Sequence, residues 1–179
     1  FIADEIQTGL ARTGKLLACD WEDVHPDMLI LGKALGGGIF PISAVLCNSD
    51  IMDVITPGIH GSTFGGNPFA CKIAITALDL IFEEGLMENA EKLGNIFRDE
   101  LNSINSPYIK EVRGRGLLNA IEIEDNSLYD GSYFCNKLAF EKKILSKYTH
   151  SKNIRFAPPL TFKEDEFREC VQKICSVFC

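Results

Sequence analysis

The sequence has 179 residues, of which 46% are hydrophobic and 24% are charged, and its formal net charge is −7. This composition is typical of a soluble globular protein with one large or two small domains. The acidic charge disfavours nucleic acid or an anionic membrane surface as a partner, and no apolar run reaches the roughly 18 residues of a membrane-spanning helix.

The seven cysteines are scattered through apolar segments without a C-x-x-C pair, and the three histidines lie far apart. These spacings disfavour a zinc site, so we expect no metal ion and interpret the cysteines as free, buried thiols in a reducing compartment. The chain opens directly on an apolar run, Phe1-Ile2-Ala3, which is typical of a strand. This opening predicts a piece of a longer protein whose targeting sequence is not in view.

Short apolar runs predict three buried strands in the first part of the chain. They cover residues 1–5, 27–33 and 42–47. Glycine-rich turns at residues 9–14 and 36–41 separate them.

The clearest helical pattern covers residues 67–104. Asn67 is a favourable N-cap, and Pro68 follows at the first helical position, where its missing N–H is tolerated. Apolar residues then recur at helical spacing, and Gly85 predicts a break between two helices. The second helix is expected to end before Pro107.

The remainder predicts a small α+β unit in which strands and helices alternate. Its elements are a strand at 116–124, a helix near 131–145, a strand at 153–157 and a helix at 163–178. We therefore expect a domain boundary near residue 95.

The segment LILGKALGGG, residues 29–38, delivers a lone lysine, Lys33, from a predicted strand into a glycine-rich bend. The glycines around it remove side chains where a bulky group would have to approach. A lysine enclosed in this way can act as an amine nucleophile and bond covalently to a carbonyl. The segment matches neither G-x-x-x-x-G-K-[ST] nor G-x-G-x-x-G. The alternative is an ordinary surface lysine at the end of a strand.

Asp4 ends the first predicted strand, so we expect it at the same edge of the sheet as Lys33, where open α/β folds bind ligands. A carboxylate beside a lysine suits a pyridoxal cofactor, because the acid keeps the ring nitrogen protonated. Residues 60–68, HGSTFGGNP, add Ser62, Thr63 and a helix start suited to a phosphate. Each feature also has a plainer interpretation, with Asp4 as a turn residue and 60–68 as a flexible turn.

Four segments together resemble the class III pyridoxal-phosphate aminotransferases over essentially the whole chain. They are FIADEIQTGLARTGK, LGKALGGGIFPISAVL, HGSTFGGNPFA and IRFAPPL. The resemblance implies the C-terminal portion of a protein more than twice this length, with an α/β fold of fold-type I. Residues 1–95 would be the later part of the large, mainly parallel-sheet domain, and residues 96–179 the C-terminal α+β small domain.

The same resemblance implies roles for individual residues of the first strand and the glycine bend. Lys33 corresponds to the lysine that holds pyridoxal 5'-phosphate and shuttles the proton. Asp4 corresponds to the partner of the pyridine nitrogen, and Gln7 to the group bonded to the ring oxygen.

Further roles come from later segments. Thr63, with Ser62, resembles the phosphate ligand supplied by the neighbouring subunit, which implies a homodimer with shared active sites. Arg155 resembles the arginine that holds a substrate carboxylate, and the alternative is a surface arginine on a strand. Four residues in family-like segments are interpreted as structural: Arg12, Asp20, Trp21 and Arg115.

Within the family, the segments GLARTG, HGSTFGGNP and GRGLLNAI are most similar to the branch that acts on ornithine. This implies transfer of the δ-amino group of ornithine to 2-oxoglutarate, giving glutamate 5-semialdehyde and glutamate. The alternatives are another ω-aminotransferase, acting on acetylornithine or 4-aminobutyrate, and a non-catalytic binding protein that reuses the fold. We expect an intracellular enzyme, in the cytoplasm rather than the mitochondrial matrix, and expect the 179-residue piece alone to be inactive.

Overall fold

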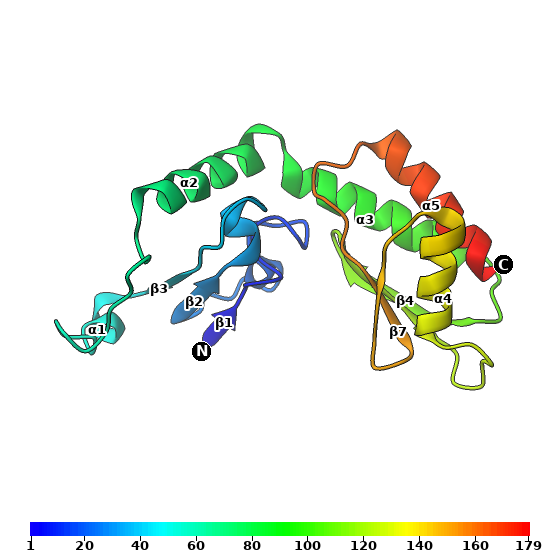
Figure 1. Ribbon diagram of the computed structural model, residues 1–179, viewed down its shortest axis with the longest axis horizontal. Helices are drawn as coiled ribbons and strands as arrows, with labels where there is room; N and C mark the ends of the chain where they lie inside the picture. Colours follow the sequence, from blue (N-terminus) through cyan, green and yellow to red (C-terminus); the bar gives the residue numbers. More distant parts are fainter. The chain divides into compact units, whose positions relative to one another are not determined.

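The computed structural model describes residues 1–179 and has mixed α/β secondary structure (Figure 1). The chain divides into two compact units, Phe1–Met87 and Glu88–Cys179. The division lies in the first turn of helix α3 (Leu86–Ser103), before the boundary near residue 95 that the sequence suggested. The difference arises because Ala90 already belongs to the apolar core of the second unit.

The first unit is built on a three-stranded sheet in the order β1-β2-β3. Strand β1 (Ile2–Asp4) is parallel to β2 (Met28–Leu31), and β3 (Ala44–Cys47) is antiparallel to β2. The three strands predicted from apolar runs are therefore confirmed, although each is shorter than its run. The short helices of this unit are η1 (Ala18–Trp21), η2 (Lys33–Gly36) and α1 (Ser49–Met52).

The long helix of the first unit begins where the capping signal predicts. Helix α2 (Pro68–Glu83) has Asn67 as its N-cap, and the Asn67 side-chain oxygen accepts a hydrogen bond of 2.9 Å from the Ala70 amide. Gly85 then adopts a φ of 60° between α2 and α3, a conformation that favours glycine. Both the start of the helical region and its break are confirmed. None of the helices combines the length and apolar character that a membrane span requires.

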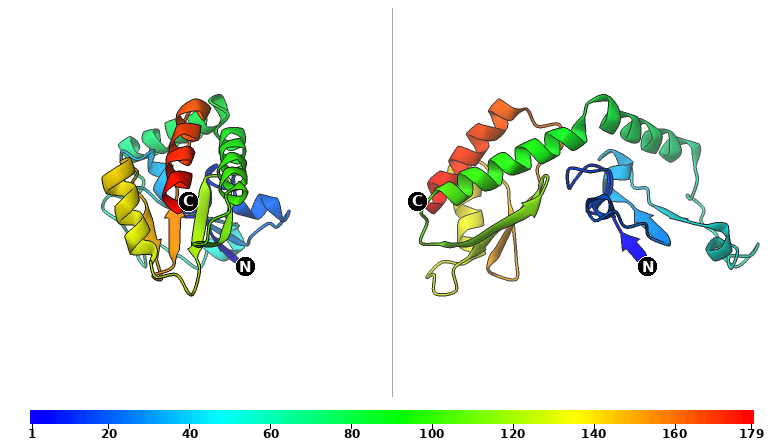
Figure 2. Two further views of the ribbon diagram at one scale, coloured as in Figure 1. Left: turned by 90° about the vertical axis from the view of Figure 1, so that its right-hand side faces the viewer. Right: turned by 180° about the vertical axis from the view of Figure 1, so that it is seen from behind.

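The second unit contains an antiparallel four-stranded sheet in the order β4-β5-β7-β6. Its strands are β4 (Ile109–Arg115), β5 (Leu118–Ile123), β6 (Lys147–Thr149) and β7 (Asn153–Phe156). Its helices are α3, α4 (Gly131–Lys137), a π-helical turn (Leu138–Lys142) and α5 (Glu164–Phe178). The helices cover one face of the sheet and leave the other without a helical layer (Figure 2).

Burial alternates along the strands at the centre of this second sheet. In β5 and β7 every second residue is buried, the pattern of strands that pack one face against a core. The buried residues pack against apolar side chains of α3, α4 and α5 in a single core. Its fully buried members include Leu93, Leu101, Ile121, Ile123, Leu138, Ile154, Val171 and Phe178.

Three features of the second unit differ from the sequence prediction. The helix expected near 131–145 ends at Lys142, because Lys143 adopts a left-handed φ of 61° that a helix cannot continue through. Strands β4 and β6 were not predicted. Of the seven free cysteines, expected to be buried, Cys135 is buried, Cys179 is exposed and the others are half-buried.

Gly94 lies where helix α3 crosses the turn between β4 and β5. A Cβ atom there would lie 1.9 Å from the backbone oxygen of Gly116, which no side-chain adjustment can relieve. Gly94→Ala is therefore expected to lower the free energy of unfolding by about 3 kcal/mol. Thermal unfolding of the full-length protein measures the loss, with Glu91→Ala on the exposed side of the same helix as the control. An unchanged midpoint would disprove the close approach.

Candidate active site

Asp4 and Lys33 lie at the same edge of the first sheet. Strands β1 and β2 are parallel, with Asp4 paired to Ile30, and Lys33 follows the end of β2 after a single glycine. The prediction that both residues share the carboxyl edge of these strands is confirmed. Both side chains are exposed, so each is available to a ligand at this edge.

The surroundings of Lys33 differ from the enclosure that the sequence suggested. Within this chain its side chain is exposed, so residues 1–179 alone do not form the enclosure that the sequence suggested. Lys33 has a φ of 42°, a left-handed conformation that is uncommon outside glycine. No hydrogen bond or ion pair occupies its amine among residues 1–179. The preceding Gly32 lets the backbone pack closely, since a Cβ there would lie 3.3 Å from Cγ2 of Ile6.

The two consecutive acids after β1 have opposite surroundings. Asp4 is exposed, and its Oδ1 accepts a hydrogen bond of 3.1 Å from the Ile6 amide. This hydrogen bond holds the carboxylate close to the end of the strand, as in a turn residue. The second carboxylate oxygen, Oδ2, remains available to a ligand. Glu5 instead is only 3% exposed.

The buried Glu5 carboxylate holds the loop that follows the strand. It accepts hydrogen bonds from the Thr8 hydroxyl and from the Cys19 amide at 2.9 Å. Burial alone would raise the Glu5 pKa, but the hydrogen bonds from Thr8 and from the amides of Cys19 and Ala18 together lower it. Sequence reasoning missed this residue. The available signal was a second acid placed directly before a glycine-rich turn.

The loop between β1 and β2 is held by its own side chains. Asp20 accepts a hydrogen bond of 2.9 Å from the Leu17 amide, and the Trp21 indole donates to the Thr13 carbonyl at 3.1 Å. The Lys15 ammonium lies 4.9 Å from the Trp21 ring centroid. These contacts support the structural interpretation of Asp20 and Trp21.

Two further residues of this loop, Gln7 and Arg12, are half-buried. Burial lowers the pKa of the Arg12 guanidinium. Gln7 is half-buried, three residues beyond Asp4, and so stays close to the candidate edge.

Ser62 and Thr63 lie in an exposed loop before α2. The Ser62 hydroxyl accepts a hydrogen bond of 2.9 Å from the Gly65 amide, so it already organises a local turn. Thr63 is exposed, and no hydrogen bond or ion pair joins either residue to Asp4 or Lys33 among residues 1–179. The structure therefore leaves the Thr63 hydroxyl available without bringing it into contact with the candidate edge.

Arg155 belongs to the second unit, at the centre of β7. It is half-buried and paired in register with Ala120 of β5 and Lys147 of β6. Its neighbours in sequence, Ile154 and Phe156, point into the core, so Arg155 points to the face without helices.

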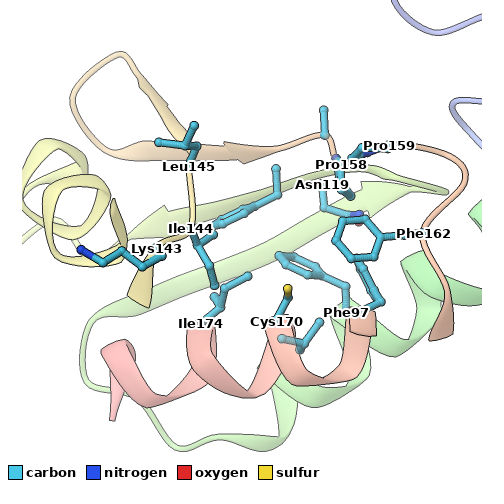
Figure 3. Close-up of a pocket in the computed structure, with 14 residues that line it drawn as sticks. Phe97, Asn119, Lys143, Ile144, Leu145, Pro158, Pro159, Phe162, Cys170 and Ile174 are labelled. Carbon is cyan, nitrogen blue, oxygen red and sulfur yellow. The ribbon is translucent and has the colours of Figure 1, made fainter. Parts of the chain in front are cut away.

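A cavity of about 420 Å³ lies within the second unit, between α5 and the segment that follows β7 (Figure 3). Its wall is mostly apolar and contains none of the predicted site residues. The two polar side chains on it are engaged, since Asn119 accepts a hydrogen bond from Arg98 and Lys143 donates to the Phe140 carbonyl. The Cys170 thiol is the other polarisable group on this wall.

The sequence profile described as Aminotransferase class-III matches residues 1–178. The chain belongs to the class-III aminotransferase family. Among class-III relatives, the "Ornithine aminotransferase, mitochondrial" of Rattus norvegicus is 56% identical over 174 residues, covering 97% of this chain and 39% of the relative. The "Ornithine aminotransferase" of a Geobacillus species is 53% identical over 178 residues, covering 99% of this chain and 44% of the relative. The chain thus spans about two fifths of the length of these relatives.

Solved structures of class-III aminotransferases share this fold. The acetylornithine aminotransferase of Elizabethkingia anophelis has a TM-score of 0.93 and 55% identity, covering 99% of this chain and 45% of that one. The ornithine aminotransferase of Toxoplasma gondii has a TM-score of 0.94 and 50% identity, covering 99% and 42%. That structure is described as having partial occupancy of PLP at its active site, and the class-III family uses this cofactor.

The residues of the first unit fit pyridoxal phosphate by their chemistry. A free amine and a carboxylate share one sheet edge, and neither is consumed by an ion pair with another residue of the chain. These are the groups needed to bond an aldehyde and to pair with a protonated ring nitrogen.

Proposed function

We propose that the complete protein is an ornithine aminotransferase. It transfers the δ-amino group of ornithine to 2-oxoglutarate with pyridoxal phosphate as cofactor, giving glutamate 5-semialdehyde and glutamate. The observation that carries this proposal is the shared edge of Asp4 and Lys33, in a chain 56% identical to the rat ornithine aminotransferase over 97% of its length.

Each predicted site residue has a chemical task in this proposal. The bound cofactor supplies an electron sink for the reacting carbon. Lys33 bonds the cofactor and moves the proton on and off that carbon. Asp4 stabilises the protonated ring nitrogen with a negative charge, and Gln7 hydrogen-bonds the ring oxygen.

The remaining parts of the proposal concern assembly. Thr63, with Ser62, binds the cofactor phosphate of a neighbouring subunit in a homodimer, which accords with an exposed loop that makes no contact with Lys33. The first unit is the later part of the large domain, and the second unit is the C-terminal small domain. Free cysteines are consistent with a reducing compartment, the cytoplasm or the mitochondrial matrix.

A second candidate activity is supported by one specific observation. The Elizabethkingia structure, at 55% identity, is named an acetylornithine aminotransferase. Initial rates of the full-length protein with 2-oxoglutarate and each of ornithine, acetylornithine and 4-aminobutyrate separate the candidates. We expect the highest kcat/KM with ornithine. A higher value with acetylornithine would replace the first proposal, and a protein without cofactor absorbance would be a binding protein that reuses the fold.

Arg155→Ala is expected to lower kcat/KM for 2-oxoglutarate by about tenfold to a hundredfold, because a charged hydrogen bond contributes roughly 1.5–3 kcal/mol. The planar guanidinium can donate two parallel hydrogen bonds to a carboxylate. The strand of Arg155 is followed by Pro158-Pro159, whose restricted backbone helps to fix the direction of the side chain. Stopped-flow measurement of each half-reaction checks the prediction, with a smaller loss expected for ornithine. Equal losses in both half-reactions, or none with the keto acid, would make Arg155 structural.

A further inference from the structure

One row of residues crosses the face of the second sheet that no helix covers. Arg113, Ala120, Arg155 and Lys147 are paired in register on β4, β5, β7 and β6 in turn. Directly opposed residues of antiparallel strands point to the same face, so these four side chains share one side of the sheet. Three of the four are cations.

The cation on β4 is compensated by its neighbours. Nη1 of Arg113 lies 2.7 Å from the carboxylates of both Glu111 and Glu122. Nη2 of Arg113 also donates a hydrogen bond to the Asn153 side-chain oxygen. The guanidinium of Arg113 is therefore already paired with acids and an amide of the sheet and is not available to an anionic ligand.

The other end of the row is not compensated. Among residues 1–179, neither Arg155 nor Lys147 has an acid within ion-pair distance, although the two are directly opposed. Opposed cross-strand residues have Cβ atoms about 5 Å apart, and like charges in this arrangement destabilise a sheet. Ala120, on the other side of Arg155, is too small to cover the guanidinium. An anion placed between these two cations would relieve the repulsion.

We infer that Lys147 is a specificity-determining residue that acts with Arg155 on the carboxylate of the keto acid. This inference rests on the proposed function, in which Arg155 holds that carboxylate. A carboxylate bound to the Arg155 fork lies within Coulombic reach of the Lys147 ammonium. The pair attracts dianionic 2-oxoglutarate and disfavours ornithine, which carries a net positive charge. Lys147 thus favours binding of 2-oxoglutarate over binding of ornithine beside Arg155.

The test uses the full-length holoenzyme with Lys147→Ala and Lys147→Arg, and Lys163→Ala as the control. Lys163 is an exposed lysine of the same unit without an ion pair. In Lys147→Ala we expect KM for 2-oxoglutarate to rise by about threefold to tenfold, with kcat nearly unchanged and KM for ornithine not raised. Lys147→Arg keeps the charge and should behave as the parent. The rise should shrink as sodium chloride is added, because the Lys147 side chain is exposed and salt screens exposed charges.

A binding measurement makes the test independent of turnover. Glutarate has both carboxylates of 2-oxoglutarate but no keto group, so its Kd, measured by calorimetry, should rise by the same factor in Lys147→Ala. An unchanged Kd and KM in a variant that still uses ornithine would overturn the inference and leave the proposed function standing. An equal rise in KM for ornithine would also overturn it, as a structural loss. Failure of the parent enzyme to use ornithine would instead overturn the proposed function.

Discussion

Replacing Lys33 with alanine is expected to lower kcat of the full-length enzyme by about 10²–10⁴-fold, the contribution of a positioned acid–base group. The substitution removes the amine next to the Asp4 edge. The Lys33 side chain is exposed and makes no hydrogen bond or ion pair within the chain, so the fold should persist. Steady-state turnover with ornithine and 2-oxoglutarate measures the loss, and circular dichroism checks the fold. Lys72→Ala, an exposed lysine of the same unit, is the matched control.

The covalent role of Lys33 has a direct readout. Borohydride reduction of the holoenzyme, followed by peptide mass mapping, should place the pyridoxyl group on Lys33. Lys15 is the nearest lysine in sequence, but it is held over the Trp21 ring and is expected to remain unlabelled. A label on Lys15, or full activity in Lys33→Ala, would disprove the assignment.

Asp4→Asn is expected to lower kcat by about 10²–10³-fold, the usual effect of removing one preorganised electrostatic group. Asparagine has nearly the same shape, and its side-chain oxygen can still accept the hydrogen bond from the Ile6 amide. The fold and the turn after β1 should therefore be kept. A neutral amide cannot hold the ring nitrogen in its protonated form, so the electron demand on the reacting carbon falls.

Two measurements separate this electrostatic effect from loss of the cofactor. Cofactor affinity, from absorbance titration, should fall much less than kcat because the phosphate is held elsewhere. Asp79→Asn, on the exposed side of α2, is the control for loss of a carboxylate. Near-normal turnover in Asp4→Asn would show that Asp4 is only a turn residue.

Local signals predicted the elements whose ends depend on backbone chemistry. Asn67 and Pro68 marked the start of α2, and Gly85 marked its separation from α3. These residues act through their own backbone preferences and through hydrogen bonds to residues only a few positions away, so the local sequence is enough to predict them. The sequence also placed Asp4 and Lys33 at one edge. Each comes at or just after the carboxyl end of a strand, and the carboxyl ends of parallel strands lie at the same edge of a sheet.

What the sequence did not predict depends on pairing between distant segments. Strand β4 contains Gly114 and four charged residues, and it is held by its ladder with β5 rather than by an apolar pattern. Strand β6 is a three-residue edge strand, too short to show any period. The burial of Glu5 and the pairing of Lys147 with Arg155 likewise exist only once a fold and a register are set.

Lys33 combines a left-handed φ of 42° with an exposed side chain that makes no hydrogen bond or ion pair in the chain. Glycine at this position would relax the backbone by about 1 kcal/mol, so stability alone selects against lysine. Under the proposed function, selection for stability and selection for an amine act in opposite directions at this position. In a duplicated copy released from catalysis, we expect this position to drift toward glycine early. The residue at position 33 would then distinguish catalytically active relatives from duplicated copies that have lost the activity.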